Sequence, residues 1–164
     1  MARTSLGIMV VEYPTHLQNA QAIQSKIAEH DVALDELEGQ SVTPAIVASV
    51  NVVAGQPVYV DATSGQLKLC SASAFASSSS IGLAAATTMA TFAAPVALSS
   101  LSLSDWTAAI GAALLTKGAR YFLGVTAGTL SLAAPTTPGQ SIVSVGIALS
   151  TTQLEIAPTP PILL

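Results

Sequence analysis

Residues 80–88 read SIGLAAATT, and residues 144–152 read SVGIALSTT. The two stretches lie 64 positions apart, and the match extends upstream into GQPVYVDATSGQLKLC from residue 55 and GARYFLGVTAGTLSLA from residue 118. A bias toward Ala, Ser, Thr and Gly raises chance similarity, but it does not explain why the glycines recur in the same order. The matched glycines are Gly55 with Gly118, Gly65 with Gly128, and Gly82 with Gly146.

Each half reads as short apolar strands separated by turn residues. The pattern therefore predicts a mainly β fold: a small β-barrel or sandwich of two pseudo-repeated halves, at about 50–98 and 114–158. Beyond the clear match, TFAAPVAL (91–98) aligns loosely with EIAPTPPILL (155–164). The strands are expected near 45–53, 57–61, 66–70, 80–86, 89–98, 120–125, 128–132, 141–149 and 153–157.

The repeated glycines have two expected roles. Residues 61–65 and 125–128 are predicted hairpin loops, with Gly65 and Gly128 where a positive φ is often needed. Gly82 and Gly146 fall inside strands, where a glycine indicates a bend or a close approach of another backbone.

Charge is scarce and unevenly distributed. The chain is 51% hydrophobic and 9% charged, whereas about a quarter of the residues are charged in an average domain. A surface this poor in charge is typical of a protein covered by its own copies or by a larger assembly. The net charge of −4 and the lack of a basic cluster argue against nucleic-acid binding. We also expect no secretory signal and no membrane span, because no apolar run reaches about 18 residues.

Eight of the fourteen charged residues lie in the first 40 positions. This shift predicts an N-terminal arm and helix at 1–40, a β domain at 41–158 and a C-terminal tail at 159–164. The helix is expected at about 15–38, between a Thr15 cap and Gly39. Its seam has heptad-like spacing and faces either the β domain or two further copies of itself. The seam residues are Ala20, Ile23, Ile27, His30, Leu34 and Leu37.

Three features outside the repeat have structural interpretations. Residues 104–115 are predicted to form a short helix, with Ser104 as its cap and Gly118 just beyond its end. Trp106 is expected to fill the core beside this helix rather than to anchor an interface. Cys70 is expected to be a buried filler, because a single cysteine excludes an internal disulfide. The terminal segments 1–14 and 157–164 read as arms that are ordered only against a neighbour.

No catalytic set, cofactor motif or metal-ligand spacing is found in the sequence. Both histidines lie in the predicted helix, away from the serines of the β domain, so a Ser–His–acid site is not expected. Phosphate-cradling glycine motifs are missing. The acids of the β domain are widely spaced and read as turn, cap or surface residues. We therefore expect no enzyme activity, no cofactor and no metal site; those acids are Asp61, Asp105 and Glu155.

The second half carries a pattern of the form G-x-x-Y-F-L, G-x-L-(S/T) and P-G-x-x-(I/V)-x-x-V-G-x-A-L-S-x-T-x-L-x-I. It is formed by Gly118, 121–123, 128–131, Pro138–Gly139 and 145–156. Over about residues 50–158 the chain resembles the small β domains of tailed-bacteriophage virion structural proteins. These include capsid decoration (cement) proteins and the modules of fibres and baseplates.

The resemblance implies a virion protein that decorates the outer capsid surface as a homotrimer and stabilises the junctions between capsomers. Its implied partners are itself and the major capsid protein or other virion proteins. An alternative within the same resemblance is a tail fibre or baseplate component with 15–38 as a coiled-coil stalk. A carbohydrate-binding or depolymerising tip is a third hypothesis, disfavoured by the shortage of aromatic and acidic residues.

Overall fold

The computed structural model describes residues 42–164. By its internal contacts the chain divides into two units, Met1–Gly39 and Gln40–Leu164, and the described residues all belong to the second. The predicted arm at 1–14, the helix at 15–38 and all six seam residues lie outside the described residues.

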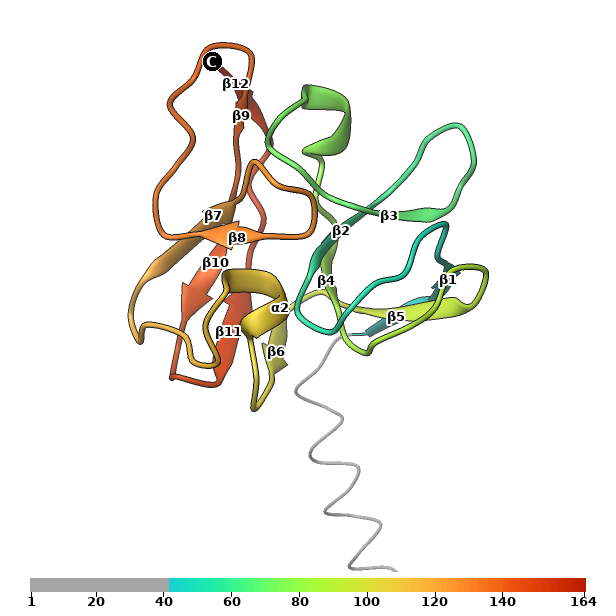
Figure 1. The fold of residues 1–164 in the computed structure, drawn as a ribbon, viewed down its shortest axis with the longest axis horizontal. Coiled ribbons are helices and arrows are strands. Elements are labelled where there is room, and N and C mark those ends of the chain that lie inside the picture. The colour runs from blue at the N-terminus through green and yellow to red at the C-terminus, as the bar shows by residue number, and fades with distance from the viewer. Residues whose placement is uncertain (1–41) are drawn as a thin grey trace, which may run out of the picture. The chain divides into compact units, whose positions relative to one another are not determined.

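The described unit is built of strands, which confirms the predicted mainly β class (Figure 1). The first half contains β1 (Val42–Val47), β2 (Pro57–Val60), β3 (Leu67–Leu69), β4 (Gly82–Ala84) and β5 (Ala93–Ala97), with a single 3-10 turn at Phe75–Ser77. The second contains β6 (Ser100–Ser102), α2 (Thr107–Ile110), β7 (Arg120–Leu123), β8 (Leu130–Ser131), β9 (Ser141–Ile142), β10 (Ser144–Ala148), β11 (Gln153–Ile156) and β12 (Ile162–Leu163).

The two five-stranded antiparallel sheets have the same topology. The strand order is β1-β5-β4-β2-β3 in the first sheet and β6-β11-β10-β7-β8 in the second. The register agrees as well, because Val58 pairs with Gly82 and the matched Tyr121 pairs with Gly146. The chain therefore folds as two equivalent halves, as the repeat predicts.

The end of the repeat alignment, however, was wrong. The structural counterpart of β5 is β11, not the segment 155–164, because β5 pairs with β4 as β11 pairs with β10. The paired residues Leu83 and Ala97 are 14 positions apart, whereas the equivalent Ile147 and Glu155 are 8 apart. The first hairpin is thus six residues longer, and a gap-free alignment misses this change.

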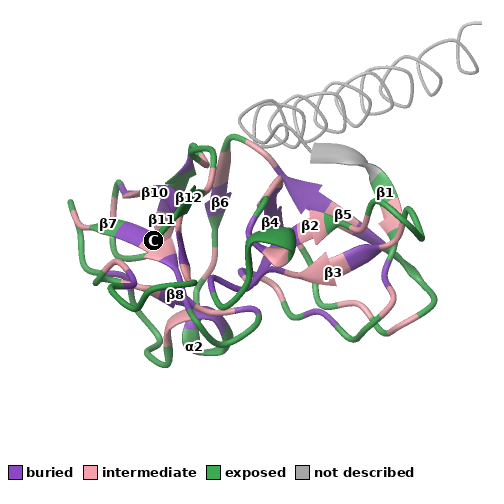
Figure 2. Ribbon diagram, turned by 90° about the horizontal axis from the view of Figure 1, so that it is seen from above, coloured by how far each residue is buried: buried purple, intermediate pink, exposed green. Residues whose placement is uncertain are grey.

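Buried residues lie in both halves (Figure 2), and part of the apolar core is shared between the halves. Ala48, which follows β1, bridges to Leu67 of β3 and so links the two edges of the first sheet around its own core. A larger core joins the halves, with Cys70 and Leu83 of the first packed in one cluster with Trp106 and Tyr121 of the second. Each half therefore buries apolar surface that it would expose alone.

The predicted helix at 104–115 is much shorter than expected. Only α2 forms, and it ends at Gly111, whose φ of +73° stops the helix in the left-handed conformation. The N-cap residue is Trp106, without a side-chain cap, rather than Ser104. Just before it, Asp105 Oδ1 accepts hydrogen bonds from the Thr107 amide at 2.8 Å and hydroxyl at 2.6 Å. Trp106 is fully buried, as predicted, and its Nε1 donates to the Thr152 carbonyl at 3.0 Å.

The C-terminal segment lies along its own chain. β12 pairs with β9, and the Leu164 amide donates to the Gln140 carbonyl at 2.9 Å. Thr159 exchanges hydrogen bonds with Ser144 nearby. The expectation that this segment needs a neighbouring subunit to be ordered was wrong.

Candidate assembly surfaces

The repeat glycines at the turns have the predicted left-handed backbone. Gly65 and Gly128 have φ values of +67° and +77°, and Gly55 and Gly118 have +87° and +78°. The two turns nevertheless use their amides differently. The Gly65 amide donates to Asp61 within its own turn, whereas the Gly128 amide donates to the Cys70 carbonyl of the other half at 2.8 Å.

The two strand glycines allow close backbone approach, as predicted. A Cβ on Gly82 would collide with the Ala97 carbonyl oxygen, and a Cβ on Gly146 would collide with that of Glu155. Gly124 is equally crowded, against Thr129. Its counterpart in the first half is Asp61, so the glycine pattern of the repeat gives no signal for it.

The titratable groups of the described part stabilise local structure. The Lys68 ammonium, 2.8 Å from the Asp61 carboxylate, and the hydrogen bonds from Ser64 hold the pKa of the Asp61 carboxyl well below its usual range. The Thr63 amide also donates to this carboxylate. Burial raises the pKa of the Cys70 thiol to about 12, so this cysteine is inert toward thiol chemistry. Asp105 has a lowered pKa because of its two bonds from Thr107.

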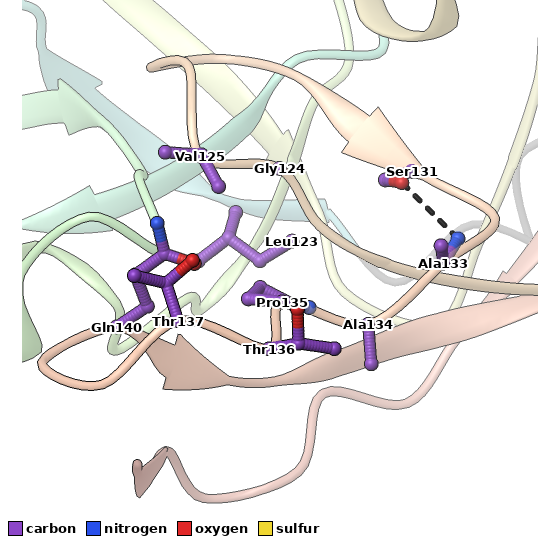
Figure 3. Close-up of a pocket in the computed structure, with 10 residues that line it drawn as sticks. All are labelled: Leu123, Gly124, Val125, Ser131, Ala133, Ala134, Pro135, Thr136, Thr137 and Gln140. Carbon is purple, nitrogen blue, oxygen red and sulfur yellow. Dashed lines mark hydrogen bonds between the residues drawn. The ribbon is translucent and has the colours of Figure 1, made fainter.

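One hollow lies between 123–125 and 131–140 and has a volume of about 320 Å³ (Figure 3). The Ala133 amide donates to the Ser131 hydroxyl at one end, while Thr137 and Gln140 lie at the other. Every residue that lines it is uncharged. The hollow therefore brings together no acid, base or activated nucleophile.

A second hollow lies between α2 and β8, and we call it the α2–β8 hollow. It has a volume of about 400 Å³. Ile110 and Leu114 contribute one wall and Leu132 another, with Tyr121 and Leu130 buried beneath. No charged residue lines it, and its lining combines apolar side chains with the polar residues Thr116 and Ser131.

The most exposed large apolar side chains of residues 42–164 are Met89 and Phe92, at 71% and 64%. They stand on residues 85–92, the projecting loop, which joins β4 to β5. Sequence reasoning missed this site because it placed 89–98 in a strand, whereas β5 begins only at Ala93. The available signal was the pair of large side chains in the otherwise small-residue stretch TTMATFAA.

Other apolar side chains are also exposed near the projecting loop and on β12. Val47, Val50 and Val53 are about two-fifths exposed and lie on the segment that the projecting loop hydrogen-bonds. Ile162 and Leu163 of β12 are also exposed. On a chain with few charges, such surface is typical of contacts with other proteins.

The chain matches no protein-family model, and no curated protein matches its sequence. Among residues 42–164, no helix is long and apolar enough to cross a membrane. Within the same residues, no three His, Cys, Asp or Glu side chains gather where they could hold a metal ion.

Proposed function

We propose that the protein is a viral structural protein, a capsid decoration protein that binds the outer capsid surface as a homotrimer and stabilises the junctions between capsomers. The observation that carries the proposal is a duplicated β frame that exposes large apolar side chains in a sequence with few charged residues. The resemblance of about residues 50–158 to virion β domains supports the same function.

The physical mechanism is burial of apolar area across subunit junctions. Each Å² removed from water contributes about 25 cal/mol before the costs of association are subtracted. Phe92 and Met89 each expose more than half of their surface. Buried aromatic side chains dominate the binding energy of many interfaces. A protein that binds at many equivalent junctions gains this energy repeatedly, and so resists outward pressure on the shell.

The proposal is tested by the ratio of this chain to the major capsid protein in purified particles, measured by quantitative mass spectrometry. A ratio expected for a protein that covers the whole capsid lattice supports the decoration function. A ratio of a few copies per particle would overturn it and favour the tail fibre or baseplate alternative. Absence from particles would overturn both.

The location is tested separately by electron microscopy with antibodies raised against residues 42–164. Labelling spread over the head is the expected result. Labelling confined to the tail would contradict the capsid location, even if the chain is abundant.

A further inference from the structure

We propose that copies of this chain associate head to tail, with Met89 and Phe92 of one copy inserted into the α2–β8 hollow of the next. This inference specifies the self-contact of the homotrimer and rests on that part of the proposed function.

The projecting loop is held rigidly by the strand segment beside it. The Thr91 amide donates to the Ala48 carbonyl at 2.7 Å, and the Ala90 amide donates to the Asn51 side chain at 2.8 Å. Val52 and Thr88 exchange two backbone hydrogen bonds of 2.9 Å. Since the loop is already ordered, its insertion into a partner costs little conformational entropy.

The loop also stores backbone strain beside its exposed side chains. Thr91 has a φ of +73° and is the non-glycine residue with positive φ in the described part of the chain. A β-branched residue adopts this conformation only when its surroundings impose it, and such strain is concentrated at functional sites. Here the strained residue lies between Met89 and Phe92.

The α2–β8 hollow is large enough to receive these side chains and includes the apolar residues Ile110, Leu114 and Leu132. A cavity of about 150 Å³ lined by apolar side chains accommodates a benzene ring, and the hollow offers about 400 Å³. Neither the hollow nor the projecting loop carries a charged residue. Their contact would therefore bury apolar surface without stranding a charge.

The two features belong to opposite halves and arise from opposite changes in length. The hairpin that carries the projecting loop is six residues longer in the first half than in the second. The connection that contains α2 is longer in the second half: 20 positions separate Leu101 from Tyr121, against 15 from Thr43 to Val58. Each copy thus has one projecting loop, in its first half, and one hollow, in its second half.

A projection on one surface and its receptor on another make a heterologous contact, in which the same copy binds two neighbours. Such contacts close into a ring when the rotation allows it. A two-fold dimer would instead make the loop-to-hollow contact twice, reciprocally, between the same two copies. The two arrangements differ in how many copies this contact links: two in the dimer and three or more in a ring.

The experiment uses the full chain with cysteines placed singly at Phe92→Cys and at Leu132→Cys, and a short bis-maleimide crosslinker. We expect covalent dimers when the two variants are mixed and allowed to exchange, at least ten-fold above either variant alone. A chain with both substitutions should give dimers and then higher species. Cys70 is fully buried, so the unsubstituted chain is the background control.

A matched control replaces Phe92→Cys with Leu149→Cys, which lies at 47% exposure just after β10, in the equivalent hairpin of the second half. When this variant is mixed with Leu132→Cys, the yield of covalent dimers should stay at the background level. Crosslinking of Phe92→Cys with itself, or a mixture no better than this control, would overturn the head-to-tail contact.

The outcomes separate this inference from the proposed function. A trimer by light scattering without the 92–132 crosslink overturns the contact and leaves the homotrimer standing. The crosslink in a protein absent from virus particles supports the contact and overturns the decoration function. A full chain that stays monomeric at high concentration overturns both the contact and the homotrimer.

Discussion

The two halves of the β unit have the same strands in the same order, but they differ in their connections. The strand pairs have the same register in both halves: Val58 pairs with Gly82 in the first, and Tyr121 pairs with Gly146 in the second. In contrast, the β4–β5 hairpin of the first half is longer than the equivalent β10–β11 hairpin of the second. The connection from β6 to β7, which contains α2, is longer than the equivalent connection from β1 to β2. The comparison teaches that the repeated frame supports the fold, while the unequal connections produce the projecting loop and the α2–β8 hollow.

The two equivalent turns, at 61–65 and 124–128, also differ in their hydrogen bonds. The Asp61 side chain closes the first turn on itself and pairs with Lys68. The equivalent position in the second half is Gly124, and the turn there donates its Gly128 amide to the first half. One turn is therefore self-contained, while the other helps to join the halves.

The largest expected effect comes from the strand glycines, which the halves share. Gly82→Ala and Gly146→Ala should each lower the free energy of unfolding by about 3 kcal/mol or more, because the new methyl group collides with a backbone carbonyl that cannot move alone. Urea denaturation followed by circular dichroism measures the loss. Gly65→Ala, which has open space around it, is the control and should cost about 1 kcal/mol. Equal losses for all three variants would show that the close approach is not a constraint.

The glycines that precede β2 and β7 should behave unequally. Gly55→Ala and Gly118→Ala both lose about 1–2 kcal/mol for a left-handed backbone. The methyl group on Gly55 would also lie 2.9 Å from Leu103 and 3.2 Å from the buried ring of Trp106, while that on Gly118 meets open space. We expect Gly55→Ala to cost about 1–3 kcal/mol more. The same denaturation assay decides, and equal costs would contradict the packing of Gly55 against the second half.

Much of the frame could be predicted from sequence because it depends on local signals. Gly65 and Gly128 mark hairpins, and apolar pairs such as Leu67 and Leu69 mark strands. The extent of α2 was missed, since the Ala-rich run hides the stop imposed by Gly111. β6 and β12 were not predicted, because such short strands are defined by their partners β11 and β9.

The candidate site could be predicted least. Met89 and Phe92 are apolar and follow a strand-like pattern, so their local sequence does not distinguish exposure from burial. Their exposure depends on bonds to Ala48 and Asn51, about 40 positions away in the chain. The α2–β8 hollow likewise exists only once Leu114 and Leu132 are brought together by the fold.

A smaller effect is expected at the strained turn of the longer hairpin. Thr91→Gly relieves the left-handed strain of a β-branched residue, and this gain exceeds the added backbone entropy of the unfolded state. We expect the free energy of unfolding to rise by about 1 kcal/mol. Thr91→Ala keeps a Cβ and is the control, with little or no gain. A loss of stability for Thr91→Gly would mean that the threonine side chain stabilises the loop more than its backbone strains it.

The smallest effect concerns the self-contained turn of the first half and its pH dependence. The lowered pKa of Asp61 means that its contribution to stability is complete above the unfolded value of about 3.9 and is lost as the pH falls further. Asp61→Asn should flatten the fall in thermal midpoint between about pH 5 and pH 2. Because the Asp61–Lys68 pair is partly exposed, screening keeps this effect below that of the glycine variants.

The Lys68 ammonium loses its contribution to stability at high pH, whereas the Asp61 carboxylate loses its contribution at low pH. Its hydrogen bond to Asp61 raises the pKa of Lys68, so the stability from that side is present at neutral pH and is lost as the pH rises above about 10.4. Lys68→Met should remove the alkaline loss but keep part of the acid loss, since Ser64 and Thr63 still donate to the Asp61 carboxylate. Gly124 offers no carboxylate at the equivalent turn of the second half, so an acid loss that persists unchanged in Asp61→Asn would have to come from outside the two turns.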